Sequence, residues 1–267
     1  MKALTQSVLA AAMLVAFPFA AAEACTINAW NGNTSAASGT SAAGPTTGQR
    51  RYSESCSLSA TAGQFVTDNT PAAEATYQVR FYVFTGGTGK IFSATTANSN
   101  GGSEVFGVSY NGTAFTFSGA SGVAPINAAP NRWYSVTATN VNGGSFSVSV
   151  QGNNAATATT GTGTAGTGLV ESASLGLIGA GTGALQFDSF ESVRSTTPIA
   201  RLCRGDTNND GARTIADAGR IRNEFLNPAT SATSGQPDYD ENGAVTIADA
   251  GLVQNLFLAG QGACPSS

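Results

Sequence analysis

The chain of 267 residues contains no histidine, and this absence removes several classes of chemistry. A Ser-His-Asp or Cys-His catalytic triad and a His-ligated zinc site each need an imidazole. Charge is also scarce, because Asp, Glu, Lys and Arg together make up only 10% of the residues. The sequence has no basic patch, so it lacks the electrostatic signature of a nucleic-acid-binding protein.

Long apolar runs are missing as well, since no segment approaches the roughly 20 apolar residues of a membrane-spanning helix. A shorter apolar stretch, Val8 to Phe19, follows Lys2 and precedes Ala22-Glu23-Ala24. This order is typical of a signal peptide cleaved before Cys25. Residues 1–24 are therefore predicted to direct secretion, to the extracellular space or the cell surface. A lipid-modified Cys25 is disfavoured, because the three residues before it lack Leu and include a charge.

The sequence has four cysteines, an even number that suits two disulfides in an exported protein. Three pairings are possible. We favour Cys25–Cys56 and Cys203–Cys264, because each pair then lies within one domain.

The acidic charge is concentrated near the C-terminus. The segment from Cys25 to Cys203 has seven basic and seven acidic residues, whereas Arg204 to Cys264 has four basic and eight acidic ones. A local excess of carboxylates indicates a cation site.

The same acidic segment contains an internal repeat. Gly205 to Leu226 and Pro237 to Leu258 are offset by 32 residues and identical at 12 of 22 positions, so one loop-helix unit is used twice. Each loop has oxygen-bearing residues at positions 1, 3, 5, 9 and 12, Gly at position 6 and a backbone carbonyl at position 7, the pattern of a calcium loop. The predicted ligands of two calcium ions are Asp206, Asn208, Asp210, Ala212, Thr214 and Asp217 in the first loop, and Asp238, Asp240, Asn242, Ala244, Thr246 and Asp249 in the second.

Both units differ from a complete EF-hand. Position 12 is Asp instead of Glu, and no helix precedes either loop, since Pro237 stands directly before Asp238. A helix is predicted after each loop, with an apolar stripe spaced by three and four residues. We expect the two helices to pack against each other through these stripes, which are Ile215, Ala218, Ile221 and Phe225, and Ile247, Ala250, Val253 and Phe257.

This duplicated pattern resembles the dockerin family, which binds cohesin domains and tethers proteins of polysaccharide degradation to a scaffold or cell surface. Dockerin-like modules can also have purely intramolecular roles. The resemblance implies a cohesin-type partner contacted by Ile215, Ala216, Arg222, Asn223, Ile247, Ala248, Gln254 and Asn255. The difference between Arg222 and Gln254 breaks the symmetry of these two faces.

The region before the repeat has short alternating segments, such as Tyr77–Phe84 and Ser145–Val150, separated by Gly- and Asn-rich turns. We predict a mainly β fold, an antiparallel two-sheet sandwich (residues 25–197), followed by a small α-helical dockerin-like module with two calcium loops (198–267). The order of the segments Tyr77–Val83, Arg132–Val136 and Leu185–Phe190 resembles that of strands in the concanavalin A-like, laminin G-like jelly rolls. An immunoglobulin-like sandwich would show much of the same alternation. Gln151–Gly168, a low-complexity Thr/Gly/Ala stretch, is expected to form an exposed loop or flexible hairpin tip, and Thr196-Thr197-Pro198 a short linker to the calcium module.

The function expected from these features is carbohydrate binding by the sandwich, in polysaccharide degradation or surface attachment. The alternatives are a jelly-roll glycoside hydrolase, which needs two carboxylates, and a structural or adhesive surface protein. Trp133 is expected in the core. The seven carboxylates of the sandwich are expected to be solvated: Glu54, Asp68, Glu74, Glu104, Glu171, Asp188 and Glu191. The aromatic candidates for stacking on sugars are Trp30, Tyr52, Tyr110, Trp133 and Tyr134.

Overall fold

The computed structural model describes residues 30, 39–41, 51–53, 56–97, 102–228 and 233–264. The predicted signal peptide and Cys25 lie outside the described residues, and so does the predicted Cys25–Cys56 bridge.

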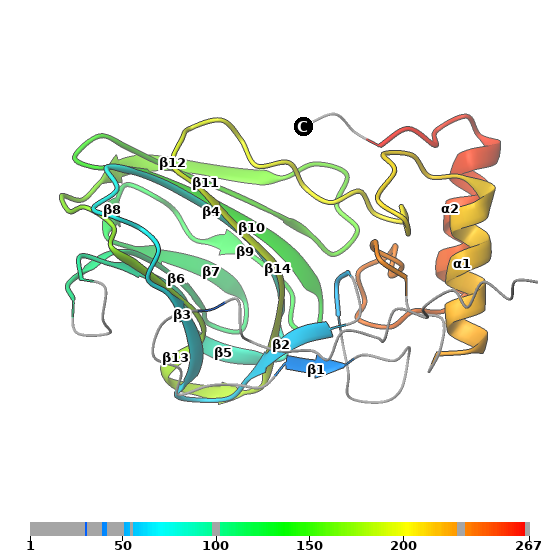
Figure 1. The fold of residues 1–267 in the computed structure, drawn as a ribbon, viewed down its shortest axis with the longest axis horizontal. Coiled ribbons are helices and arrows are strands. Elements are labelled where there is room, and N and C mark those ends of the chain that lie inside the picture. Colours follow the sequence, from blue (N-terminus) through cyan, green and yellow to red (C-terminus); the bar gives the residue numbers. More distant parts are fainter. Residues whose placement is uncertain are drawn as a thin grey trace, which may run out of the picture.

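The fold is mainly β, with two antiparallel sheets and two C-terminal helices, as predicted (Figure 1). The first sheet has the order β1-β2-β14-β4-β10-β11-β12-β8, and the second has β3-β13-β5-β6-β7-β9. The strands of the first sheet are β1 (Gly39–Ser41), β2 (Cys56–Ala60), β14 (Leu185–Val193), β4 (Thr76–Phe84), β10 (Trp133–Val141), β11 (Ser145–Gly152), β12 (Thr159–Ala165) and β8 (Ala120–Ser121). Those of the second are β3 (Gln64–Asp68), β13 (Ser172–Gly183), β5 (Gly87–Thr95), β6 (Glu104–Tyr110), β7 (Ala114–Ser118) and β9 (Ile126–Asn127).

Alternation along the strands explains the main core. In β11, Phe146, Val148 and Val150 are buried, while the residues between them face outward. Successive side chains of a strand point to opposite faces, so these three residues lie on the inner face of the sheet. In β4 both faces are buried, because one covers the core and the other is itself covered.

The prediction of an irregular tip over Gln151–Gly168 is wrong for its second half, which forms β12 between β11 and β8. Thr and Gly alternate in this strand. A Cβ atom at Gly163 would lie 2.2 Å from the carbonyl oxygen of Ser121, so the glycine allows β8 to approach. Composition alone suggested a loop, although Thr favours strands.

The outer face of the first sheet is covered by the chain that follows the sandwich. Three side chains on that face of β4 bind the backbone of residues 199–202: Gln78 Oε1 accepts from Ile199 N (2.8 Å), Arg80 donates to the carbonyl of Ala200, and Tyr82 Oη accepts from Leu202 N (2.6 Å). Leu202 also packs on a second apolar cluster, formed by Tyr52, Tyr82, Phe84 and Trp133. This aromatic cluster confirms the expected burial of Trp133, although on the outer face of the sheet.

Two helices follow, α1 (Ile215–Leu226) and α2 (Ile247–Leu258). They lie side by side, and their buried residues form a separate small core, as predicted (Figure 1). The expected apolar stripes are buried only in their middle parts. Ala218, Ile221, Ala250 and Val253 are buried, whereas Ile215, Phe225, Ile247 and Phe257 are exposed. Among the described residues, no helix has the length and apolar character needed to cross a membrane.

Candidate metal centre and its attachment to the sandwich

The first predicted calcium loop is a closed turn with ordered polar groups. Asp206 accepts hydrogen bonds from the backbone of Asp210 (3.2 Å) and Gly211 (2.8 Å). Asp217, the third residue of α1, accepts from the backbone and the hydroxyl groups of Thr207 and Thr214. Burial acts to raise the pKa of Asp217, but these hydrogen bonds outweigh it and lower that pKa below its usual value.

The second loop repeats the same turn and brings its carboxylates closer together. Asp238 accepts from the backbone of Asn242 (3.2 Å) and Gly243 (2.7 Å). Carboxylate oxygens of Asp238, Asp240 and Asp249 lie within 4.8 Å of one another, and Asp238 and Asp249 are buried. Burial and then the charge of Asp249 raise the pKa of Asp238 well above its usual value.

These residues fit a hard divalent cation. Three carboxylates at this distance repel one another in a partly buried loop, and a cation among them would neutralise that repulsion. In the first loop, Oδ1 of Asn208, at ligand position 3, is buried and accepts no hydrogen bond. An amide oxygen left without a donor suits a metal ligand. Carbonyl oxygens at position 7 come from Ala212 and Ala244, and position 9 is occupied by Thr214 and Thr246.

The predicted disulfide between Cys203 and Cys264 is present, and it closes the module beside the first loop. Cys264 N donates to the carbonyl of Gly211 (3.3 Å), and Ala212 pairs with Ala263 in an isolated bridge. The bridge therefore joins the segment around Cys264 to the first predicted calcium loop.

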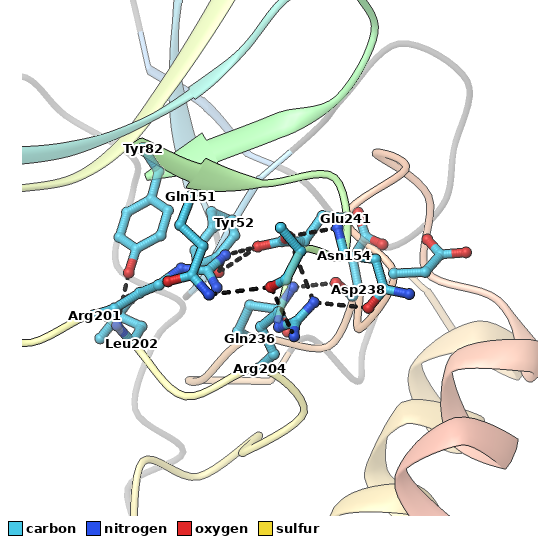
Figure 2. Close-up of polar contacts among 12 residues, drawn as sticks. Tyr52, Tyr82, Gln151, Asn154, Arg201, Leu202, Arg204, Gln236, Asp238 and Glu241 are labelled. Carbon is cyan, nitrogen blue, oxygen red and sulfur yellow. Dashed lines mark hydrogen bonds and ion pairs between the residues drawn. The ribbon is translucent and has the colours of Figure 1, made fainter. Parts of the chain in front are cut away.

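The second loop contacts the sandwich through Glu241, whose side chain is fully buried (Figure 2). Its carboxylate forms ion pairs with Arg201 and Arg204, and accepts hydrogen bonds from Tyr52 Oη (3.0 Å) and Asn154 N (3.1 Å). Burial raises the pKa of Glu241, although Arg201 and Arg204 act in the opposite direction. Sequence analysis did not identify Glu241, because position 4 of a calcium loop is not a ligand position.

The backbone of the second loop joins the same contact. Trp133 N donates to the carbonyl of Glu241 at 3.0 Å, so the loop extends the hydrogen bonding at the first residue of β10. Arg204 also donates to Asn154 Oδ1 (2.8 Å) and lies over the ring of Tyr239, 5.0 Å from its centre. The module is thus attached by polar groups from both sides of the junction.

A second attachment joins Arg51 to Glu224 of α1. Both side chains are buried, at 3% and 0% exposure, and they form an ion pair. Glu224 also accepts a hydrogen bond from Thr233 N at 3.0 Å. The apolar pattern of α1 had suggested Phe225 for the inward face. Glu224 takes that place because Arg51 supplies its counter-charge.

The residues predicted to contact a cohesin-type partner are all exposed: Ile215, Ala216, Arg222, Asn223, Ile247, Ala248, Gln254 and Asn255. Both sets lie on the helices, which stand at the end of the molecule away from the sheets (Figure 1). The attachment to the sandwich therefore leaves both sets accessible.

The aromatic residues considered for sugar stacking have packing roles in the structure. Tyr52, Tyr110, Trp133 and Tyr134 are buried. Trp30 is partly buried and packs on Phe190, with ring centres 4.7 Å apart. Tyr52, Tyr110 and Trp133 are therefore not available to stack on a sugar in this conformation, whereas Tyr134 also lines a surface pocket.

The expectation that the sandwich carboxylates are all solvated is wrong for several of them. Glu104 accepts from Lys90, Ser93 and Ser118 at 2.6–2.7 Å. The carboxylate of Asp188 accepts from the backbone of Tyr52 (2.6 Å) and Ser53 (2.9 Å).

Three further acidic side chains of the sandwich, Asp68, Glu74 and Glu191, also have partners. Removal from water raises the pKa of Asp188 to about 6 despite its hydrogen bonds. A register shift of β14 separates Asp188 from Glu191, which pairs with Arg80 at 3.0 Å. Glu74 pairs with Arg194 and Asp68 accepts from Thr70 N, while Glu54 lies outside the described residues. Within the described residues, the hydrogen bonds and ion pairs of these carboxylates support the fold of the sandwich. They involve Asp68, Glu74, Glu104, Asp188 and Glu191.

The C-terminal segment with the two loops and two helices matches a known protein family. Residues 204–258 match the family model of the dockerin type I domain, so the chain carries a dockerin-like module C-terminal to a β-sandwich. The match covers a minor part of the 267-residue chain. No curated protein matches the chain significantly.

Solved structures resemble this chain only distantly. The receptor-binding domain of botulinum neurotoxin type G is 12% identical, with a TM-score of 0.35 over 58% of this chain and 42% of that chain. The carbohydrate esterase vb_24B_21 from bacteriophage phi24B is 13% identical, with a TM-score of 0.39 over 60% and 88%. Trypanosoma rangeli sialidase is 14% identical, with a TM-score of 0.37 over 65% and 33%. The chain spans less than half the length of the neurotoxin chains that it matches, and similarity this low indicates no function.

Proposed function

We propose that this protein is a secreted, calcium-dependent tethering protein. Each loop of the dockerin-like module binds one calcium ion, the helices bind a cohesin-type partner, and the sandwich binds a polysaccharide. The observation that carries the proposal is the group of three carboxylates, Asp238, Asp240 and Asp249, within 4.8 Å of one another in a loop with calcium-loop spacing. The match to the dockerin type I family supports the same assignment.

Calcium titration of the intact, oxidised protein tests the metal assignment. We expect calorimetry to show two bound ions. Asp206→Ala and Asp238→Ala should each remove one of them, because each removes the first ligand of one loop. Asn209→Ala serves as the control, since Asn209 lies in the first loop between ligand positions and is exposed. Absence of calcium uptake at millimolar concentration would contradict the proposal.

The polysaccharide assignment needs a surface on the sandwich, and a shallow pocket of about 350 Å³ offers one. It is lined by Thr113, Asn127, Ala128, Ala129, Pro130, Tyr134 and Asn153. Amide and hydroxyl groups beside apolar side chains suit a sugar ring, which has both hydroxyl groups and apolar faces.

A glycan array, run with and without calcium, tests this assignment. We expect retention of a polysaccharide, and weaker retention for Asn127→Ala and Asn153→Ala with unchanged calcium binding. Loss of a single hydrogen bond to a ligand should lower the affinity about tenfold. Release of reducing ends from soluble polysaccharides would favour the alternative of a glycoside hydrolase. Retention of no glycan would contradict the polysaccharide assignment.

A further inference from the structure

The two calcium loops differ at position 4, which lies between two predicted ligands. In the first loop this residue is Asn209, which is exposed and donates only within the module, to the carbonyl of Ser234 (3.1 Å). In the second loop it is Glu241, which is buried against the sandwich. The backbone is left-handed at both residues, with φ of 56° and 59°. The same turn therefore presents a solvent-facing side chain in one loop and an anchor in the other.

We propose that the second loop binds two partners at once: a calcium ion on its inner side and the chain's own sandwich on its outer side. Calcium binding to this loop and docking of the module are then thermodynamically coupled. The first loop lacks this coupling. The inference rests on the proposed calcium function, because it needs the second loop to be a calcium site.

The coupling follows from the positions of the residues along the loop. Glu241 lies directly between Asp240 and Asn242, at ligand positions 3 and 5, so the loop cannot rearrange around the ion without moving Glu241. Without a cation, the carboxylates of Asp238, Asp240 and Asp249 repel one another and favour an open loop.

An open loop would damage the contact with the sandwich. Withdrawal of Glu241 leaves the partly buried Arg201 without its carboxylate and breaks the hydrogen bond from Trp133 N. An unpaired charge in a buried site is strongly unfavourable. By linkage, the coupling is reciprocal: loss of the docking contact must weaken calcium binding by the same factor.

The surface under the second loop supplies a reporter. Trp133 is fully buried in the aromatic cluster with Tyr52, Tyr82 and Phe84, beside the carbonyl of Glu241. The chain has two tryptophans, so Trp30→Phe leaves Trp133 as the single emitting indole. Its fluorescence reports whether the loop covers the cluster.

The first measurement uses the full-length Trp30→Phe protein. Chelation of calcium should shift the emission of Trp133 to longer wavelength, because water reaches the indole. Asp238→Ala should give the same shift in the presence of calcium, whereas Asp206→Ala should not. Unchanged emission on chelation, in a protein that calorimetry shows to bind calcium, would overturn the coupling and leave the proposed calcium function intact. Absence of calcium binding would overturn both.

The second measurement reverses the direction of the test. In an Asp206→Ala background, which leaves the second loop as the predicted site, Glu241→Ala should lower calcium affinity at least about fivefold. Glu241→Gln keeps the shape of the side chain but removes its charge, and it should also lower the calcium affinity. It replaces Glu241→Ala in the measurement if that variant fails to fold. The matched control is Asn209→Ala in an Asp238→Ala background, which should leave the affinity of the first loop unchanged. If the Asp206→Ala protein binds calcium with the same affinity with and without either Glu241 substitution, the inference is overturned.

Discussion

Chelation of calcium is expected to lower the unfolding temperature of the C-terminal module by about 10–20 °C for each ion removed. An ion present at 100 times its dissociation constant stabilises a folded site by about 2.7 kcal/mol. In a domain of this size, each kcal/mol shifts the unfolding temperature by about 4–8 °C. The apolar core of the module has few members, among them Ala218, Ile221, Ala250 and Val253, so apolar burial alone contributes little to its stability. Scanning calorimetry of the oxidised chain, with calcium and with chelator, measures the shift.

The double variant Asp206→Ala, Asp238→Ala is the control for this experiment. It lacks the first ligand of both loops, so it should unfold at the lower temperature in either buffer. The unfolding of the sandwich itself should change less, because its core is separate from that of the module. An unmodified protein whose unfolding temperature is the same in both buffers would contradict the assignment of the loops.

Arg51→Met is expected to destabilise the protein by about 3–5 kcal/mol. This change leaves the carboxylate of Glu224 buried without its counter-charge, and broken buried ion pairs have effects of that size. Glu224→Leu should also be destabilising, since it leaves Arg51 unpaired and Thr233 N without its acceptor. Denaturant unfolding of the calcium-loaded protein measures both free energies.

The double variant Arg51→Met, Glu224→Leu completes the cycle. Two apolar side chains of similar length can replace a buried ion pair with little loss, so most of the stability should return. A remaining loss of about 1–3 kcal/mol is expected from the unpaired Thr233 N–H. If the two single effects simply add in the double variant, the two side chains do not interact and the attachment through Arg51 is contradicted.

The local features of this protein could be predicted from its sequence. Calcium loops, capped helices and alternating strands depend on residues within a few positions of one another. The two helices, the Cys203–Cys264 bridge and the inward face of β11 are present as predicted. The ligand assignments stay predictions, which the calcium titration tests.

The features that sequence analysis missed depend on distant partners. Glu241 differs from its repeat equivalent Asn209, yet nothing local shows that Tyr52, Arg201 and Asn154 N meet its carboxylate. Glu224 is similarly buried because of Arg51, 173 residues away along the chain. In both cases a carboxylate that no local pattern marks as inward-facing is buried, because arginines that only the folded chain brings together supply its counter-charge.

The covered outer face of the first sheet has a mechanical consequence. Residues 199–202 are bound to β4, Glu241 to the start of β10, and Glu224 to Arg51, so the connection between the sheets and α1 and α2 behaves as a stiff bracket instead of a swinging chain. The helices stand at the far end of this bracket (Figure 1). A partner bound to the helices would therefore fix the orientation of the sandwich relative to that partner, as well as the distance between them.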